Sequence, residues 1–132
     1  HKMEAKKATI QFKKFLPGIA WFLFVMVLLC LPGDDVPDEG DWFIPQFDKL
    51  VHATLFGGLV FLFCMPFKKT TMAASEKINL FIRISLACIV WGITTEYIQK
   101  FFIHGRDFDL LDWAADSAGI IIAFFVSRKF FI

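Results

Sequence analysis

Ionisable side chains gather near the ends of the apolar segments of this chain. His52 follows Lys49 by three residues and Asp48 by four, and Gln99 follows Glu96 by three. Residues three or four apart share one face of a helix. An imidazole beside carboxylates can transfer protons, and the same groups can hold a divalent cation. These residues predict a site for acid–base or cation chemistry.

Three carboxylates open the last apolar segment. Asp109, Asp112 and Asp116 are spaced by three and four residues, so on a helix they project from one face. Arg106, just before them, offers a planar fork for a carboxylate or phosphate, and Gly105 permits a tight turn. Since carboxylates four apart repel each other, either one of Asp112 and Asp116 is protonated or a cation lies between them.

The elements that must position these groups are membrane-spanning helices. The 132 residues are 57% apolar, with a mean hydropathy of +0.59, which excludes an ordinary soluble domain and a nucleotide enzyme of several domains. A spanning helix needs about 20 apolar residues, whereas a barrel strand needs about 10 that alternate in polarity. Four continuously apolar runs, 15–31, 50–67, 80–99 and 110–127, predict an all-α integral membrane four-helix bundle.

The remaining segments set the orientation. Residues 1–14 form a basic arm, 15–132 form the four-helix domain, and 32–49 form an acidic loop; His1 and Lys2, ahead of Met3, resemble an expression remnant. Lysine and arginine in short connections favour the cytoplasmic side. The arm, the second connection and the C-terminal tail are basic, so we expect both termini inside a bacterial cytoplasmic membrane and the polar groups facing outside.

Ionisable groups inside a span are costly in lipid and therefore turn inward. Ala115, Gly119 and Ala123 continue the carboxylate face as a stripe of small residues, which lets a neighbouring helix approach closely. Taken alone, Asp109 is better explained as a helix cap, and Lys49 is equally explained as a flank residue that reaches toward the headgroups. The cysteines at 30, 64 and 88 lie at different depths, which excludes a disulfide between them.

Three motifs in order carry a resemblance. The stretches "DKLVHATLFGGL", "TEYIQKFF" and "GRDFDLLDWAADSAG" resemble the VanZ-like family of small bacterial membrane proteins, whose pattern often has Asn at the position of Asp116. The resemblance implies a role in the bacterial envelope, in which the named member is associated with reduced susceptibility to the glycopeptide teicoplanin. It points to the following residues: Asp48, Lys49, His52, Glu96, Gln99, Arg106, Asp109, Asp112 and Asp116.

Three functions fit these residues. The site binds a lipid-linked or peptide-like envelope component, with Lys49 and Arg106 on its anionic group. Alternatively it is an enzyme with His52, Glu96 and Asp112 as catalytic candidates and Asp48, Gln99, Asp109 and Asp116 around the substrate. The cofactor is left open, with a divalent cation as one option and no metal ligands assigned. The third is a structural ion-pair network. Membrane lipids are expected partners and nucleic acid is not.

Overall fold

The computed structural model describes residues 10–31, 47–105 and 108–132. The acidic segment 32–46, the first nine residues and Arg106 lie outside the described residues. The described elements are η1 (Phe12–Phe15), α1 (Leu16–Leu29), α2 (Phe47–Cys64), η4 (Met65–Phe67), α3 (Ala74–Phe102) and α4 (Leu110–Phe131).

The prediction of four membrane-spanning helices is confirmed. Four helices are long and apolar enough to cross a membrane, and the described residues include no strand. The main difference is α3, which begins at Ala74 rather than near residue 80. Glu76 and Lys77 occupy its first turn, and a helix can extend past the apolar core because its backbone hydrogen bonds are internal. Lys77 Nζ also donates to the Lys68 carbonyl at 3.1 Å, which anchors this turn to the end of the preceding helix.

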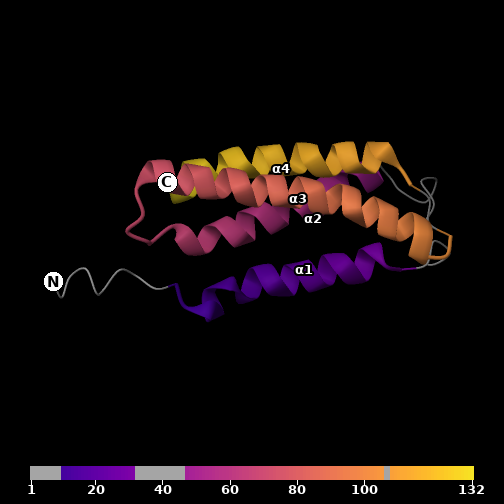
Figure 1. The fold of residues 1–132 in the computed structure, drawn as a ribbon, viewed down its shortest axis with the longest axis horizontal. Coiled ribbons are helices and arrows are strands. Elements are labelled where there is room, and N and C mark those ends of the chain that lie inside the picture. The colour runs from indigo at the N-terminus through magenta and orange to yellow at the C-terminus, as the bar shows by residue number, and fades with distance from the viewer. Residues whose placement is uncertain (1–9, 32–46, 106–107) are drawn as a thin grey trace.

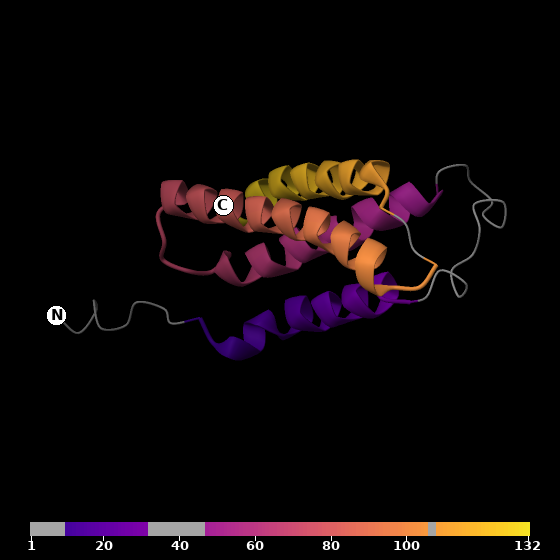
Figure 2. The same cartoon turned by 45° about the vertical axis from the view of Figure 1, so that its right-hand side comes forward.

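Helix α2 lies at the centre of the bundle and contacts the other three helices (Figures 1 and 2). Its closest neighbour is α4, where Gly119 faces α2. A Cβ atom at Gly119 would overlap the backbone carbonyl of Ala53, and a Cβ at Gly57 would lie 3.0 Å from the Gly119 carbonyl oxygen. The predicted stripe of small residues therefore does bring the carboxylate-bearing helix against its neighbour.

Helix α1 lies on the far side of α2 from α4 and is the least buried span (Figure 1). Two side-chain bonds secure it. Trp21 Nε1 donates to the Leu55 carbonyl of α2 at 2.9 Å, and Gln99 Nε2 of α3 donates to the Leu29 carbonyl at 3.0 Å. Leu29 ends α1, where carbonyls lack partners within the helix, so the Gln99 amide satisfies a group that would otherwise be unpaired.

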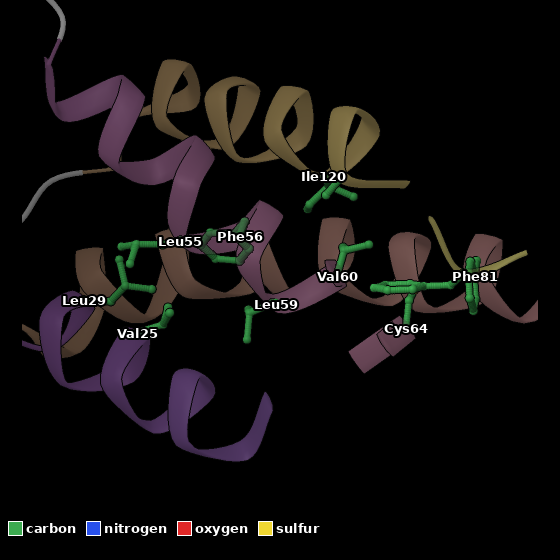
Figure 3. Close-up of a cluster of buried hydrophobic side chains, with 11 residues drawn as sticks. Val25, Leu29, Leu55, Phe56, Leu59, Val60, Cys64, Phe81 and Ile120 are labelled. Carbon is green, nitrogen blue, oxygen red and sulfur yellow. The ribbon is translucent and has the colours of Figure 1, made fainter. Parts of the chain in front are cut away.

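The apolar core runs along α2 through the length of the bundle (Figure 3). Phe56, Val60 and Phe81 are fully buried in it, together with Ile120 of α4 and Val25 of α1. The three cysteines are free, as expected from their different depths. Since one apolar core extends along the whole bundle, the polar groups where α2 and α4 begin are held by closely packed helices.

The two ends of the bundle differ in charge. The start of α1, the connection from α2 to α3 and the end of α4 lie together (Figure 1) and carry Lys13, Lys14, Lys68, Lys69, Lys77, Arg128 and Lys129. We call this the basic end. The opposite end, where α2 and α4 begin and α3 finishes, is the acidic end. This separation agrees with the predicted orientation, which itself stays a prediction.

Candidate polar site at the acidic end

Lys49 is the centre of an ion-pair network. Its Nζ atom donates to Asp48 Oδ2 at 3.0 Å, to Asp109 Oδ2 at 2.9 Å and to Asp112 Oδ1. An ammonium has three donors, so all three are engaged. The first turn of α2 is thereby tied to the start of α4, since Asp109 is the N-cap of α4 and Asp112 lies in its first turn. We call Lys49, Asp48, Asp109 and Asp112 the Lys49 network.

Asp109 is also the N-cap of α4, which is the role predicted from the sequence as the alternative to a site residue. Its Oδ1 accepts the Leu111 backbone N–H at 2.9 Å, while its extended backbone precedes the first helical residue. The hydrogen bond from the Lys49 ammonium holds the pKa of this carboxyl below its usual value of 3.8, and the bond from the Leu111 N–H acts in the same direction. The Asp109 carboxylate is thus ionised and fixed as part of the helix start.

One turn further along α2, His52 meets two carboxylates of α4. Its Nδ1 lies 3.0 Å from Asp116 Oδ1, and its Nε2 lies 3.5 Å from Asp112 Oδ2. Asp116 is fully buried and His52 is 8% exposed. An imidazole whose one nitrogen is bonded to a carboxylate is held in a fixed orientation, with its tautomer set by that bond. The predicted common face of Asp109, Asp112 and Asp116 is therefore the face that contacts α2.

Glu96 of α3 completes the group. Its side chain is fully buried, and Oε1 accepts the Asp109 backbone N–H at 3.0 Å. The other oxygen, Oε2, and Asp116 Oδ2 have no hydrogen-bond partner among the described residues. A buried charged group without a partner is costly, by several kcal/mol in a low-dielectric setting. Glu96 Oε2 and Asp116 Oδ2 would therefore be stabilised by a bound proton, a hydrogen-bond donor or a cation.

His52, Glu96 and Asp116 form the second part of the site, which we call the His52 cluster. Each offers one nitrogen or oxygen atom, and the three atoms lie within 4.8 Å of one another. The three residues come from α2, α3 and α4 respectively, so the cluster exists only when these helices are assembled. Such a group can exchange protons with a ligand, accept hydrogen bonds from it or coordinate a metal ion.

The remaining predicted residues take different places. Gln99 is buried and its Nε2 donates to the Leu29 carbonyl at the end of α1, so its amide joins α3 to α1 and does not belong to the His52 cluster. Arg106 lies outside the described residues, and its predicted contact with an anion is untested. Gly105 has a φ of 77°, the left-handed conformation that glycine adopts readily, and the predicted tight turn after α3 is present there.

Two residues near the cluster were not predicted from the sequence. Gly92 lies beside Asp116, because a Cβ built on it would be 3.4 Å from Asp116 Oδ2 and 3.2 Å from Trp113 Cδ1. Thr95 is nearly fully buried next to Glu96, with its hydroxyl bonded to the Gly92 carbonyl. The available signal was helical spacing, since Gly92 precedes Glu96 by four residues and so shares its face.

Comparison of the chain with known families, curated proteins and solved structures gave no match. What the geometry shows is a four-helix membrane protein with a buried group of His52, Glu96 and Asp116 at one end.

Proposed function

We propose that this chain is a VanZ-like integral membrane protein whose His52 cluster acts by acid–base chemistry on a bacterial envelope component. The observation that carries the proposal is the buried contact of His52 with Asp116, with Glu96 beside it and a spare carboxylate oxygen on each acid. Its further support is that all three stretches of the resemblance contribute to one end of the bundle. A role in teicoplanin susceptibility belongs to this proposal.

His52 is the base in this proposal. Asp116 accepts from or shares a proton with Nδ1, which orients the ring and stabilises its charged form when Nε2 gains a proton. Glu96 is the acid, because its Oε2 atom has no partner among the described residues and can carry a proton to a leaving group. Asp112 has its Oδ1 bonded to Lys49, so it assists from the side of His52 Nε2.

The hydrogen-bonding capacity of the site supports a particular ligand chemistry. Lys49 has its three donors on carboxylates, so it is a weak candidate for gripping a phosphate, and that role falls to Arg106 in the proposal. The spare atoms of the His52 cluster are acceptors, which suit hydroxyl or amine groups of a sugar or peptide. Helices exposed to acyl chains on their outer faces suit a lipid-linked substrate.

A structural role is the second candidate, and the Lys49 network favours it. One ammonium bound by three carboxylates fastens α2 to α4 without needing a ligand. This interpretation accounts well for Lys49 and Asp109, whereas Asp48 Oδ1 is also without a hydrogen-bond partner among the described residues. It gives no role to the unpartnered oxygens of Glu96 and Asp116, because purely structural polar groups in a core are normally satisfied.

The test is expression of the chain in a susceptible bacterium, with teicoplanin susceptibility and envelope lipid and muropeptide profiles as readouts. Glu96→Gln and His52→Ala should abolish any change that the wild-type chain causes. The matched control is Glu76→Gln, the same substitution on the same helix at its exposed, basic end. Membrane abundance is measured for every variant. Retention of the effect by Glu96→Gln at equal abundance would refute the acid–base role.

A further inference from the structure

The His52 cluster has the composition of a transition-metal site. One imidazole and two carboxylates come from three helices, and all three residues are buried. Hard ions such as Ca²⁺ prefer about six to eight oxygen ligands, whereas an imidazole with a few carboxylates suits Zn²⁺ or Mn²⁺. Three protein ligands with one open position are typical of a metal that also meets a substrate.

The distances fit a shared ion. Ligand atoms that each lie about 2.0–2.2 Å from one ion are roughly 3–3.5 Å from each other. His52 Nδ1 and Asp116 Oδ1 are 3.0 Å apart, and the three candidate atoms lie within 4.8 Å. Side-chain adjustment within the cluster would therefore bring all three atoms into range. Glu96 Oε2 has no hydrogen-bond partner among the described residues, so coordination through that oxygen breaks no hydrogen bond.

The excess of negative charge at the acidic end also favours a bound cation. Five carboxylates of the described residues lie at this end: Asp48, Glu96, Asp109, Asp112 and Asp116. In the part of the chain that the structure describes, the basic groups in ion pairs with them are Lys49 and His52, whereas Lys100 and His104 at the same end are exposed. The Lys49 ammonium neutralises part of this charge, and the hydrogen bonds it donates go to Asp48, Asp109 and Asp112 rather than to Glu96 or Asp116. Within the cluster, His52 is the one group that can carry a positive charge opposite the two fully buried acids. A divalent cation between them supplies positive charge and gives a partner to the oxygens of Glu96 and Asp116 that lack one among the described residues.

We propose that His52, Glu96 and Asp116 bind one divalent transition-metal ion, of the Zn²⁺ or Mn²⁺ type, at the acidic end of the bundle. This deepens the proposed function by naming a cofactor for the same site, in which Glu96 is a ligand rather than a proton donor while the ion is bound. It rests on that function only for what the ion is used for. At the site the ion would polarise a phosphoryl or carbonyl oxygen of the envelope component and activate a water molecule.

The experiment measures metal bound by the purified full chain in detergent micelles. The protein is stripped with EDTA, equilibrated with Mn²⁺ or Zn²⁺ and analysed for metal content, with Mn²⁺ binding also followed by electron paramagnetic resonance. We expect about one ion per chain, a raised melting temperature on metal addition and no displacement by excess Ca²⁺. Wild-type protein that binds no ion, or binds Ca²⁺ equally well, would overturn the proposal without requiring any variant to fold.

The variants locate the ion. Glu96→Gln and Asp116→Asn should weaken binding by about 100-fold or more, since loss even of supporting groups costs about 10–100-fold. Glu76→Gln at the basic end should bind as the wild type does. Asp48→Asn distinguishes a defined site from a diffuse acidic field, because it removes one charge of the Lys49 network only. Equal weakening by Asp48→Asn and Glu96→Gln contradicts the assignment.

The two proposals fail separately. Metal binding is read on purified protein, whereas the acid–base role is read from the envelope of growing cells. If no metal binds and Glu96→Gln still abolishes the envelope effect, the metal inference is wrong and the proposed function survives. If metal binds at the cluster and the envelope effect is unchanged in Glu96→Gln, the site exists and the proposed function is wrong.

Discussion

His52 Nδ1 lies 3.0 Å from Asp116 Oδ1, which joins α2 to α4 through two buried side chains. Three residues earlier on α2, Lys49 joins the same two helices through Asp109 and Asp112. Neighbouring positions on one face of α2 thus have different surroundings. The lysine has all its donors engaged, whereas the histidine belongs to a group with unpartnered acceptors among the described residues.

Lys49 should be important for stability. Replacing it by methionine leaves Asp48, Asp109 and Asp112 without their shared cation, so we expect a loss of about 2–4 kcal/mol in the free energy of unfolding. Chemical unfolding in detergent measures this change. Lys100→Met is the control, because Lys100 is exposed on α3 and should change stability little. If the two variants are equally stable, the Lys49 network does not hold α2 to α4.

The contact between α2 and α4 depends on Gly119. Gly119→Ala places a methyl group into the Ala53 carbonyl, so the helices must separate, and we expect a loss of about 1–3 kcal/mol. The melting temperature in detergent reports the loss. The neighbouring residue Ala118 is exposed, and Ala118→Leu should leave the melting temperature near that of the wild type. Equal tolerance at the two positions would show that the helices do not meet at Gly119.

The pH dependence of stability should reveal the ion pair of Asp109. Its pKa is lowered in the folded protein by the Lys49 hydrogen bond, so the ionised form favours folding above the usual pKa of 3.8. This contribution disappears as the pH falls through the lower folded value. Asp109→Asn keeps a capping oxygen and loses the charge. The wild type should therefore exceed this variant by about 0.5 kcal/mol at neutral pH, since the group is partly exposed.

Thermal melting of both proteins across the acidic range measures that difference, which should shrink below about pH 4. A difference that stays constant with pH would mean that the Asp109 charge does not contribute to folding.

The orientation of the bundle can be tested with single cysteines in a background without Cys30, Cys64 and Cys88. His104→Cys lies at the acidic end and Thr70→Cys lies at the basic end. A membrane-impermeant thiol reagent added to intact cells should label the cysteine at position 104 and not the one at 70, because lysine-rich connections stay inside. Labelling of position 70 instead would place the His52 cluster on the cytoplasmic side.

The helices could be predicted from the sequence because a spanning helix needs only a long apolar run, which local composition records directly. The start of α3 could not, since Glu76 and Lys77 are as compatible with a polar connection as with a helix that extends into the headgroup region. The stripe around Gly119 correctly indicated the face of α4 that meets α2, because helical spacing alone defines that face.

Several of the residues that meet at the acidic end were named from the sequence, but their division into the Lys49 network and the His52 cluster was not. Spacing along single helices groups Lys49 with His52, and Asp112 with Asp116, without saying how the helices are rotated against each other. Only their packing decides that Lys49 takes Asp109 and Asp112 while Asp116 faces His52. Gln99 was expected at the site because its spacing groups it with Glu96. The C-terminal end of α3 approaches α1 (Figure 2), and Gln99 instead donates to the Leu29 carbonyl.

The most direct test of a functional His52 cluster compares Glu96→Gln with Lys49→Met, with stability measured on purified protein stripped of metal and the envelope effect measured in growing cells. A site that is preorganised for a ligand holds a buried charge at some cost to folding, so Glu96→Gln should unfold at the wild-type free energy or above it and still abolish the envelope effect. Lys49→Met should lose stability as described. If Glu96→Gln instead destabilises the protein as much as Lys49→Met does, and the envelope effect falls only in proportion to folded protein, the cluster is structural.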